Sequence, residues 1–237
     1  MDSELARKAT AELVGTAFLV AIVVGSGIFA QRLSPHDVGL QLLENSTATG
    51  AGLIALILAF GSVSGAHFNP VVTLADRFLG GLSSAEAAIY VVAQVVGACI
   101  GAVIANFMFD LSAVTWSTHT RSSGGLWLGE VVATFGLLMV ILGAVRSGRG
   151  SAAPFAVGGY IAAAYWFTSS TSFANPAVTI GRTLTNTFTG IKPSSAPAFI
   201  VAQLLGGLGA VALARYLYPH LPAVDLIVPH EQPDHLE

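Results

Sequence analysis

The chain has 237 residues, of which 54% are apolar and only 10% are charged, with a formal net charge of −3. Because a soluble domain carries about 25% charged residues, this composition excludes a soluble globular protein. The ten Lys and Arg residues are scattered and form no basic stripe, which excludes nucleic-acid binding. The single cysteine, Cys99, excludes a disulfide framework and a CxxC metal or redox site.

Long apolar segments recur along the whole chain. They cover residues 11–31, 48–66, 84–109, 125–145, 152–167 and 196–218. Each is close to the roughly 20 residues that cross a hydrocarbon core, so we predict an all-α membrane protein with six transmembrane helices. With six spans, both termini lie on one side of the membrane, and six of the ten Lys and Arg residues fall on that side. Because basic residues are more frequent in cytoplasmic loops, this count favours cytoplasmic termini. The first segment lacks a cleavage site and is expected to be retained. Residues 219–237 are expected to form a polar cytoplasmic tail.

The sequence contains an internal repeat. Residues 69–74 (NPVVTL) share four of six positions with residues 175–180 (NPAVTI), and residues 90–97 resemble residues 199–206. Glu12 and Thr16 in the first unit correspond to Glu130 and Thr134 in the second, at the same spacing. The chain therefore consists of two three-span units, at about 9–109 and 124–218. Since each unit has an odd number of spans, the second unit inserts upside down and the repeats have inverted topology.

Each repeat contains an Asn-Pro pair that predicts the start of a short helix. Asn69 and Asn175 are preferred N-cap residues, and Pro70 and Pro176 occupy the favoured first helical position. The helical stretches 70–79 and 176–185 are about 15 Å long, half the hydrocarbon thickness. In inverted repeats, the two half-helices would begin near the bilayer midplane.

The loops before the half-helices predict a pore. Irregular backbone at membrane depth occurs only where it is buried in protein or lines a water-filled cavity. We therefore expect the loop backbone to line a pore, formed by Gly65, Ala66, His67, Phe68, Thr171, Ser172 and Phe173. Two helix N-termini aimed at one point would repel cations, and the Asn amides would orient a passing water or hydroxyl and interrupt a proton wire.

The intramembrane acids Glu12 and Glu130 admit two interpretations. As an ionisable pair within the membrane they could carry protons in a pump. Their duplication favours a structural role, in which they accept hydrogen bonds from the two loops. His67 has no counterpart in the second repeat, where Phe173 takes its place. It could brace the loop, contribute backbone to the pore, or gate the pore with its side chain.

These motifs, with Ser64-Gly65-Ala66-His67-Phe68-Asn69-Pro70 and Ala11-Glu12-Leu13-Val14-Gly15-Thr16, resemble the major intrinsic protein family of aquaporins and aquaglyceroporins. The resemblance covers about residues 9–218. It implies a single channel domain over residues 1–237, with six spans, two half-helices and no cofactor or metal. It also implies a homotetramer in the lipid of a bacterial inner membrane. Each protomer would conduct water or small uncharged solutes passively and would not be an enzyme.

In that family four positions set the narrowest point of the pore. Counted from the two asparagines, they correspond here to Thr49, Ala163, Ser172 and Val178. The family usually has arginine at position 178 and an aromatic residue at position 49. Its first motif usually ends in alanine, where this chain has Val71, whereas the second motif ends in Ala177 as is usual. The exchanges predict a wider, less polar filter without the usual arginine. Arg182, one turn beyond Val178, could keep a cation in the outer vestibule or could only pair with a loop carbonyl.

The Asn175-Pro176-Ala177-Val178 ending also resembles a bacterial branch of aquaglyceroporin-like channels associated with arsenic resistance. That likeness implies arsenous acid or methylated arsenicals as solutes, although glycerol and urea fit the same argument. A strict water channel is one alternative. An ion-coupled secondary transporter is another, because such proteins also use inverted repeats and broken helices.

Overall fold

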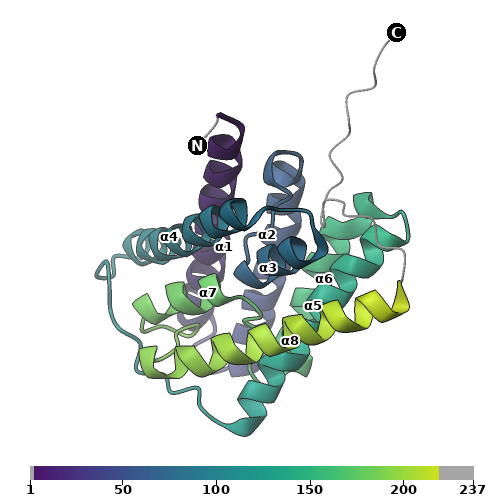
Figure 1. Cartoon of the computed structure of the whole chain (residues 1–237). Coiled ribbons are helices and arrows are strands. Elements are labelled where there is room, and N and C mark those ends of the chain that lie inside the picture. The colour runs from purple at the N-terminus through teal and green to yellow at the C-terminus, as the bar shows by residue number, and fades with distance from the viewer. Residues whose placement is uncertain (1–2, 219–237) are drawn as a thin grey trace.

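The structure, a computed structural model, describes residues 3–218, so the predicted tail at 219–237 lies outside the described residues. The α-helices are α1 (Ser3–Leu33), α2 (Val38–Ser64), α3 (Pro70–Leu79), α4 (Ser84–Met108), α5 (Gly124–Arg146), α6 (Ala153–Phe167), α7 (Pro176–Gly181) and α8 (Ala196–Leu217). These long and short helices are joined by loops, the longest of which connects α4 to α5 (Figure 1). Three 3-10 turns, η1 (Gly150–Ala152), η2 (Arg182–Leu184) and η3 (Pro193–Ser195), precede α6, follow α7 and precede α8.

The predicted all-α architecture of six long helices and two short ones is confirmed. Five segments are long and apolar enough to cross a membrane, namely α1, α2, α4, α5 and the stretch Pro193–Leu217 that contains α8. The sixth, α6, has only 15 residues, about 22 Å at 1.5 Å per residue. It is short because the chain turns back into the protein after Phe167, as the loop that leads to α7.

The two repeats pack in the same way. Helix α1 packs against α2 and α4, and its counterpart α5 packs against α6 and α8. The short helices connect the repeats, since α3 and α7 each contact both α4 and α8. In Figure 1, α3 and α7 lie among the long helices. The half-helices are therefore held by both halves of the chain.

Several polar side chains are buried in this fold, and many large apolar ones face outward. Glu12, Gln94, Glu130 and Gln203 are fully buried. The outer surface carries exposed aromatic and aliphatic residues on every long helix, such as Leu128, which is 62% exposed. An extensive apolar exterior of this kind suits contact with lipid rather than water.

Glycines allow the closest helix contacts. A Cβ added to Gly97 or Gly101 of α4 would lie 2.2 or 2.1 Å from a backbone oxygen of α1. Gly206 of α8 approaches the α5 backbone in the same way, at 2.4 Å. Gly159 of α6 differs, because an added Cβ there meets nothing within 4 Å in the described chain. The small residues of α4 and α8 thus pack inside the bundle, whereas Gly159 faces away from it.

Candidate functional site

The half-helices begin at the two Asn-Pro pairs. The Asn69 side chain accepts a hydrogen bond from the Val71 N–H at 2.9 Å, and Pro70 is the first residue of α3. Asn175 caps α7 by accepting from the N–H groups of Ala177 and Val178. These contacts satisfy backbone donors that have no partner within the helix.

The lengths of the half-helices differ from each other. Helix α3 has the predicted bounds, 70–79. The prediction of a second half-helix over 176–185 was too long, because α7 ends at Gly181 and continues as the 3-10 turn η2. Glycine and the β-branched threonines at 183 and 185 are weak helix formers, which accounts for the early end.

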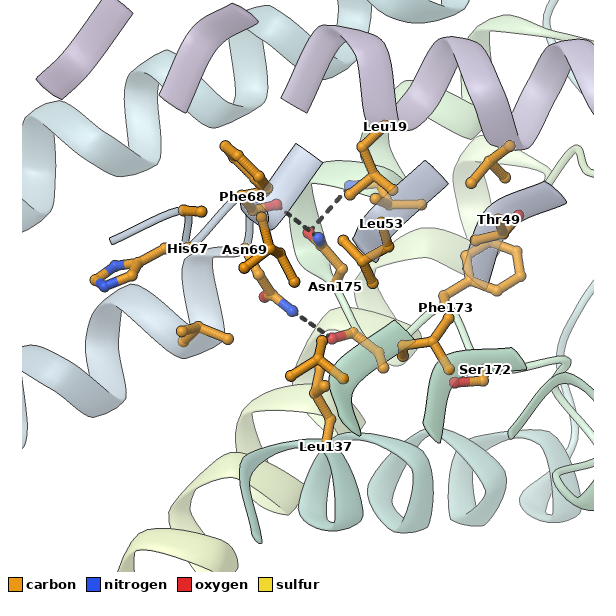
Figure 2. Close-up of a pocket in the computed structure, with 18 of the residues that line it drawn as sticks. Leu19, Thr49, Leu53, His67, Phe68, Asn69, Leu137, Ser172, Phe173 and Asn175 are labelled. Carbon is orange, nitrogen blue, oxygen red and sulfur yellow. Dashed lines mark hydrogen bonds between the residues drawn. The ribbon is translucent and has the colours of Figure 1, made fainter. Parts of the chain in front are cut away.

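The two asparagines also join the two loops crosswise. Asn69 Nδ2 donates to the Ala174 carbonyl, and Asn175 Nδ2 donates to the Phe68 carbonyl, both at 2.7 Å. Figure 2 shows these bonds as dashed lines from each asparagine side chain to the backbone carbonyl of the opposite loop. An amide group carries two N–H donors, so each asparagine keeps one donor beyond its bond to the opposite loop. Sequence analysis missed these bonds, which join residues more than 100 positions apart.

Both loops adopt the same unusual backbone conformation. Ala66 and Phe68, three and one positions before Asn69, have φ values of 49° and 50°. Ser172 and Ala174, at the same offsets from Asn175, both have φ values of 49°. Residues other than glycine rarely adopt this left-handed region, at a cost of about 1–3 kcal/mol each. The loops therefore need strong external contacts to keep their shape.

Glu12 supplies those contacts to the first loop. Its Oε1 accepts from the Ser64 hydroxyl at 2.6 Å and the His67 N–H at 3.0 Å. Its Oε2 accepts from the Phe68 N–H and from Gln94 Nε2, both at 2.7 Å. Both carboxylate oxygens thus accept hydrogen bonds from loop and helix donors, so Glu12 fixes the first loop to the neighbouring helices.

Glu130 holds the second loop in the equivalent way. Its two oxygens accept from the N–H groups of Phe173 and Ala174 at 2.9 Å, and Gln203 donates to it at 2.6 Å. Gln94 and Gln203 in turn donate to the hydroxyls of Thr73 and Thr179 on the half-helices. In each repeat a Glu–Gln–Thr chain of hydrogen bonds therefore links the loop, the last long helix and the half-helix.

His67 is 7% exposed and lies on the wall of the central cavity. Its Nδ1 is 3.2 Å from the Thr73 hydroxyl, and its ring packs edge-on against Tyr90. In Figure 2, His67 lies on one side of the paired asparagines, and Thr49 and Ser172 lie on the other. The side chain is therefore braced by α3 and α4 while one part of it borders the cavity.

The loops and asparagines border a narrow cavity of about 50 Å³. A water molecule needs about 10–15 Å³ by this measure, so the space holds roughly three to five waters. Most of the wall is aliphatic and consists of Leu19, Val23, Leu53, Ile57, Val72, Leu137, Ile141, Val157, Ile161 and Val178. Polar groups come from Thr49, His67, Asn69, Tyr165, Ser172, Asn175 and Arg182. Among the remaining predicted site residues, Ala66, Phe68 and Phe173 border this cavity, and Gly65, Pro70, Val71, Thr171, Pro176 and Ala177 do not.

The chain is similar to several known proteins. The chain matches the major intrinsic protein family over residues 1–173 and 155–234. It belongs to this family. It is 48% identical over 233 residues to aquaglyceroporin AqpS of Rhizobium meliloti, covering 98% of this chain and 99% of that one. It is 29% identical to the probable aquaporin AqpM of Archaeoglobus fulgidus, covering 92% and 99%. The X-ray structure of the aquaglyceroporin from Plasmodium falciparum shares the fold with a TM-score of 0.69 at 20% identity, covering 92% and 98%.

Membership of the major intrinsic protein family makes the chain a multi-pass membrane channel for water or small neutral solutes, and not an enzyme. The geometry is consistent with this class. The described site contains a narrow, mostly aliphatic cavity with a few converging polar groups, and the buried acids beside it accept hydrogen bonds from the loops.

Three of the four predicted filter positions border this cavity, and the fourth does not. Thr49, Ser172 and Val178 line the cavity, but Ala163 is exposed and lies off its wall. Tyr165 lines the cavity instead, with its hydroxyl 3.2 Å from that of Thr49. Positions two residues apart on a helix differ by about 200° around its axis and so lie on opposite faces. Position 163 therefore faces out of the described bundle, while position 165 faces the cavity.

A guanidinium and two aromatic rings, from Arg182, Tyr165 and Phe173, border the same cavity as the predicted filter position Val178. Arg182 is only 2% exposed and borders the same cavity as Val178. Its Nε donates to the Thr189 carbonyl, and its guanidinium carbon lies 3.3 Å from the centroid of the Phe173 ring. Side chains on a helix point back toward its N-terminus, which brings an arginine at position 182 to the preceding turn.

Proposed function

We propose that the chain is an aquaglyceroporin-like channel that passes water, glycerol and neutral arsenic species down their concentration gradients. The observation that carries this proposal is the composition of the cavity wall, which combines a long aliphatic lining with a few hydroxyl, amide and guanidinium groups. A small polyol has the same two kinds of surface, with C–H groups and hydroxyls. Its hydroxyls would bond to the polar groups while its carbon atoms contact the aliphatic residues.

Neutral arsenic compounds fit the same description. Arsenous acid is an uncharged trihydroxide, and its hydrogen-bonding surface resembles that of a polyol. A methylated arsenical adds a methyl group, which would contact aliphatic residues such as Leu53, Ile161 and Val178. The relative with 48% identity is itself described as an aquaglyceroporin.

Cation exclusion in this proposal comes from the two half-helix starts. Helices α3 and α7 begin at asparagines whose amides bond to each other's loops, so their positive ends converge on the same stretch of the cavity. Each asparagine offers its second N–H to a passing oxygen. A water that accepts from both amide donors has no lone pair left to accept from a neighbouring water and can only donate along the file, which interrupts proton transfer.

A strict water channel is the second candidate, and the cavity volume of about 50 Å³ favours it. Glycerol has six heavy atoms and needs more room than a single file of waters. The aliphatic side chains around the passage would have to move for it to pass. The two candidates make opposite predictions for solute flux.

Stopped-flow light scattering on proteoliposomes separates them. We expect permeability to water, glycerol and arsenous acid above that of empty liposomes, unchanged when proton or sodium gradients are imposed. Val178→Arg should reduce glycerol and arsenous acid flux more than water flux, because it adds a long side chain to the wall. Water flux alone would establish the strict water channel. Flux that follows an ion gradient would establish an ion-coupled transporter.

We also propose a homotetramer in the bacterial inner membrane, with both termini cytoplasmic. Gly159 and Ala163 face outward on α6, and small residues at this spacing permit close approach by a second helix. The loop at 146–149 contains two arginines, which favours the cytoplasmic side. Native mass spectrometry tests the assembly, and labelling of single cysteines in intact cells tests the topology. A monomer, or an external label on the 146–149 loop, would refute the respective proposal.

A further inference from the structure

We propose that Arg182 is the cation that sets the selectivity of this pore, in place of the arginine that the family usually carries at position 178. This inference rests on the proposed function and deepens it. Arg182 would repel cations and donate a hydrogen bond to the oxygen of a neutral hydroxylated solute.

The first argument is where the guanidinium lies. Arg182 and Val178 are one helical turn apart, and both border the cavity. The same cavity wall includes Tyr165, Thr49 and Ser172. An arginine at position 182 therefore reaches the passage that an arginine at 178 would enter, and Val178 leaves room for it.

The second argument is how the side chain is bonded. Nε donates to the Thr189 carbonyl, and the guanidinium stacks on Phe173. Within residues 3–218, Nη1 is buried and has no hydrogen-bond partner, and the same holds for the Ser172 hydroxyl. Buried polar groups are normally satisfied, so a donor and a hydroxyl left open on a cavity wall are suited to a passing solute.

The third argument is the chemistry of the group. Nη1 can only donate, and Ser172 can donate or accept. The Thr49 and Tyr165 hydroxyls, 3.2 Å apart, add a second polar pair on the same wall. A neutral solute with hydroxyl oxygens can accept from Arg182 and bond to Ser172. A cation cannot accept from Arg182 and is repelled by its charge.

Arg121 shows what a purely structural arginine looks like at this site. It donates to the Gly190 and Phe188 carbonyls and lies 5.2 Å from the Phe173 ring, yet it does not border the cavity. It therefore shares with Arg182 both the aromatic partner and the 188–190 loop. This makes Arg121 a matched control for loop support without pore exposure.

The test compares Arg182→Met with Arg121→Met in proteoliposomes. Methionine keeps much of the length of arginine and removes its charge. For Arg182→Met we expect proton and potassium permeability to rise at least about tenfold, since a buried charge beside the passage is removed. We expect its glycerol-to-water permeability ratio to fall about two- to tenfold, the value of one lost hydrogen bond. Arg121→Met should stay within about twofold of the wild type on both measures.

The outcomes separate this inference from the proposed function. If the wild type conducts neutral solutes and Arg182→Met matches it in both cation exclusion and solute ratio, Arg182 is not the selecting group and only this inference fails. If the wild type conducts nothing above empty liposomes, the proposed function fails. If both methionine variants leak cations equally, the effect belongs to loop support and the inference is overturned.

Arg182→Lys decides the matter if Arg182→Met does not fold. Lysine keeps the charge but lacks the planar fork of donors. Cation exclusion should then stay at the wild-type level while the glycerol-to-water ratio changes at least about threefold. An unchanged ratio with Arg182→Lys would overturn the proposal.

Discussion

Glu12→Gln tests whether the buried acids hold the pore loops or carry protons. The substitution preserves the shape of the side chain and replaces one oxygen by an NH₂ group. Each oxygen of Glu12 receives one loop N–H, from His67 or Phe68, and one side-chain donor. Whichever oxygen is replaced, a backbone N–H of the loop then faces another donor and loses its partner.

The magnitude follows from counting these bonds. A buried N–H without a partner costs about 1–3 kcal/mol. The two bonds to the remaining oxygen lose their charge assistance, which costs about 1 kcal/mol each. We therefore expect Glu12→Gln to lower the free energy of unfolding by about 3–5 kcal/mol. For a chain of this size that corresponds to roughly 6–20 °C in melting temperature.

The assay is thermal unfolding in detergent, followed by water permeability of the reconstituted protein. Glu4→Gln is the matched control, because Glu4 lies on the same helix, 65% exposed, in an ion pair with Lys8. An exposed pair contributes about 0–1 kcal/mol, so the control should melt within about 3 °C of the wild type. Glu130→Gln should resemble Glu12→Gln, because it removes the equivalent brace from the second loop.

A single result would refute the reasoning. If Glu12→Gln melts like the wild type and instead abolishes a dependence of solute flux on the proton gradient, Glu12 carries protons. The protein would then be a coupled transporter. Loss of stability with gradient-independent flux in both proteins is the result that the hydrogen bonds predict.

Three further predictions follow from the packing and the cavity wall. Gly101→Ala should lower the melting temperature by roughly 2–12 °C, since its Cβ would meet a backbone oxygen of α1 at 2.1 Å. Gly125→Ala, where an added Cβ meets nothing within 4 Å in the described chain, should leave the melting temperature unchanged or raise it slightly; equal melting of the two variants would contradict the close contact. Asn175→Asp keeps an oxygen that caps α7, but it loses the donor to the opposite loop and adds a negative charge. Potassium flux into liposomes should therefore rise at least about tenfold. A variant that still excludes potassium would count against a role of Asn175 in cation exclusion. Tyr165→Phe removes the hydroxyl beside Thr49 and should lower the glycerol-to-water permeability ratio about two- to tenfold; an unaltered ratio would place Tyr165 outside the filter.

Much of the architecture follows from local chemistry in the sequence. Apolar segments of membrane length, the matching Asn-Pro pairs and the duplicated acids predict six long helices, two short ones and a repeat. The starts of the two half-helices were also predictable, because Asn69-Pro70 and Asn175-Pro176 encode a cap and a first turn within two residues. The end of α7 was less predictable than its start, since the length of α7 depends on how η2 packs as well as on helix propensity.

The wall of the pore was decided by the tertiary structure. Counting residues from Asn175 indicated Ala163, but the rotation of α6 in the packed bundle brings Tyr165 to the cavity instead. Position 178 alone suggested a filter without a cation. The path of the Arg182 side chain, fixed by Phe173 and the Thr189 carbonyl, brings a guanidinium to the cavity wall beside Val178.

The sequence by itself therefore determined the class of protein and the start of each half-helix, because hydrophobic length, capping and proline geometry are local properties. Only the tertiary structure decided which groups share the cavity and how the two loops are joined. Asn69 bonds to residue 174 and Asn175 to residue 68. Contacts over such distances depend on how helices rotate and approach, and neighbouring residues in the chain do not specify that geometry.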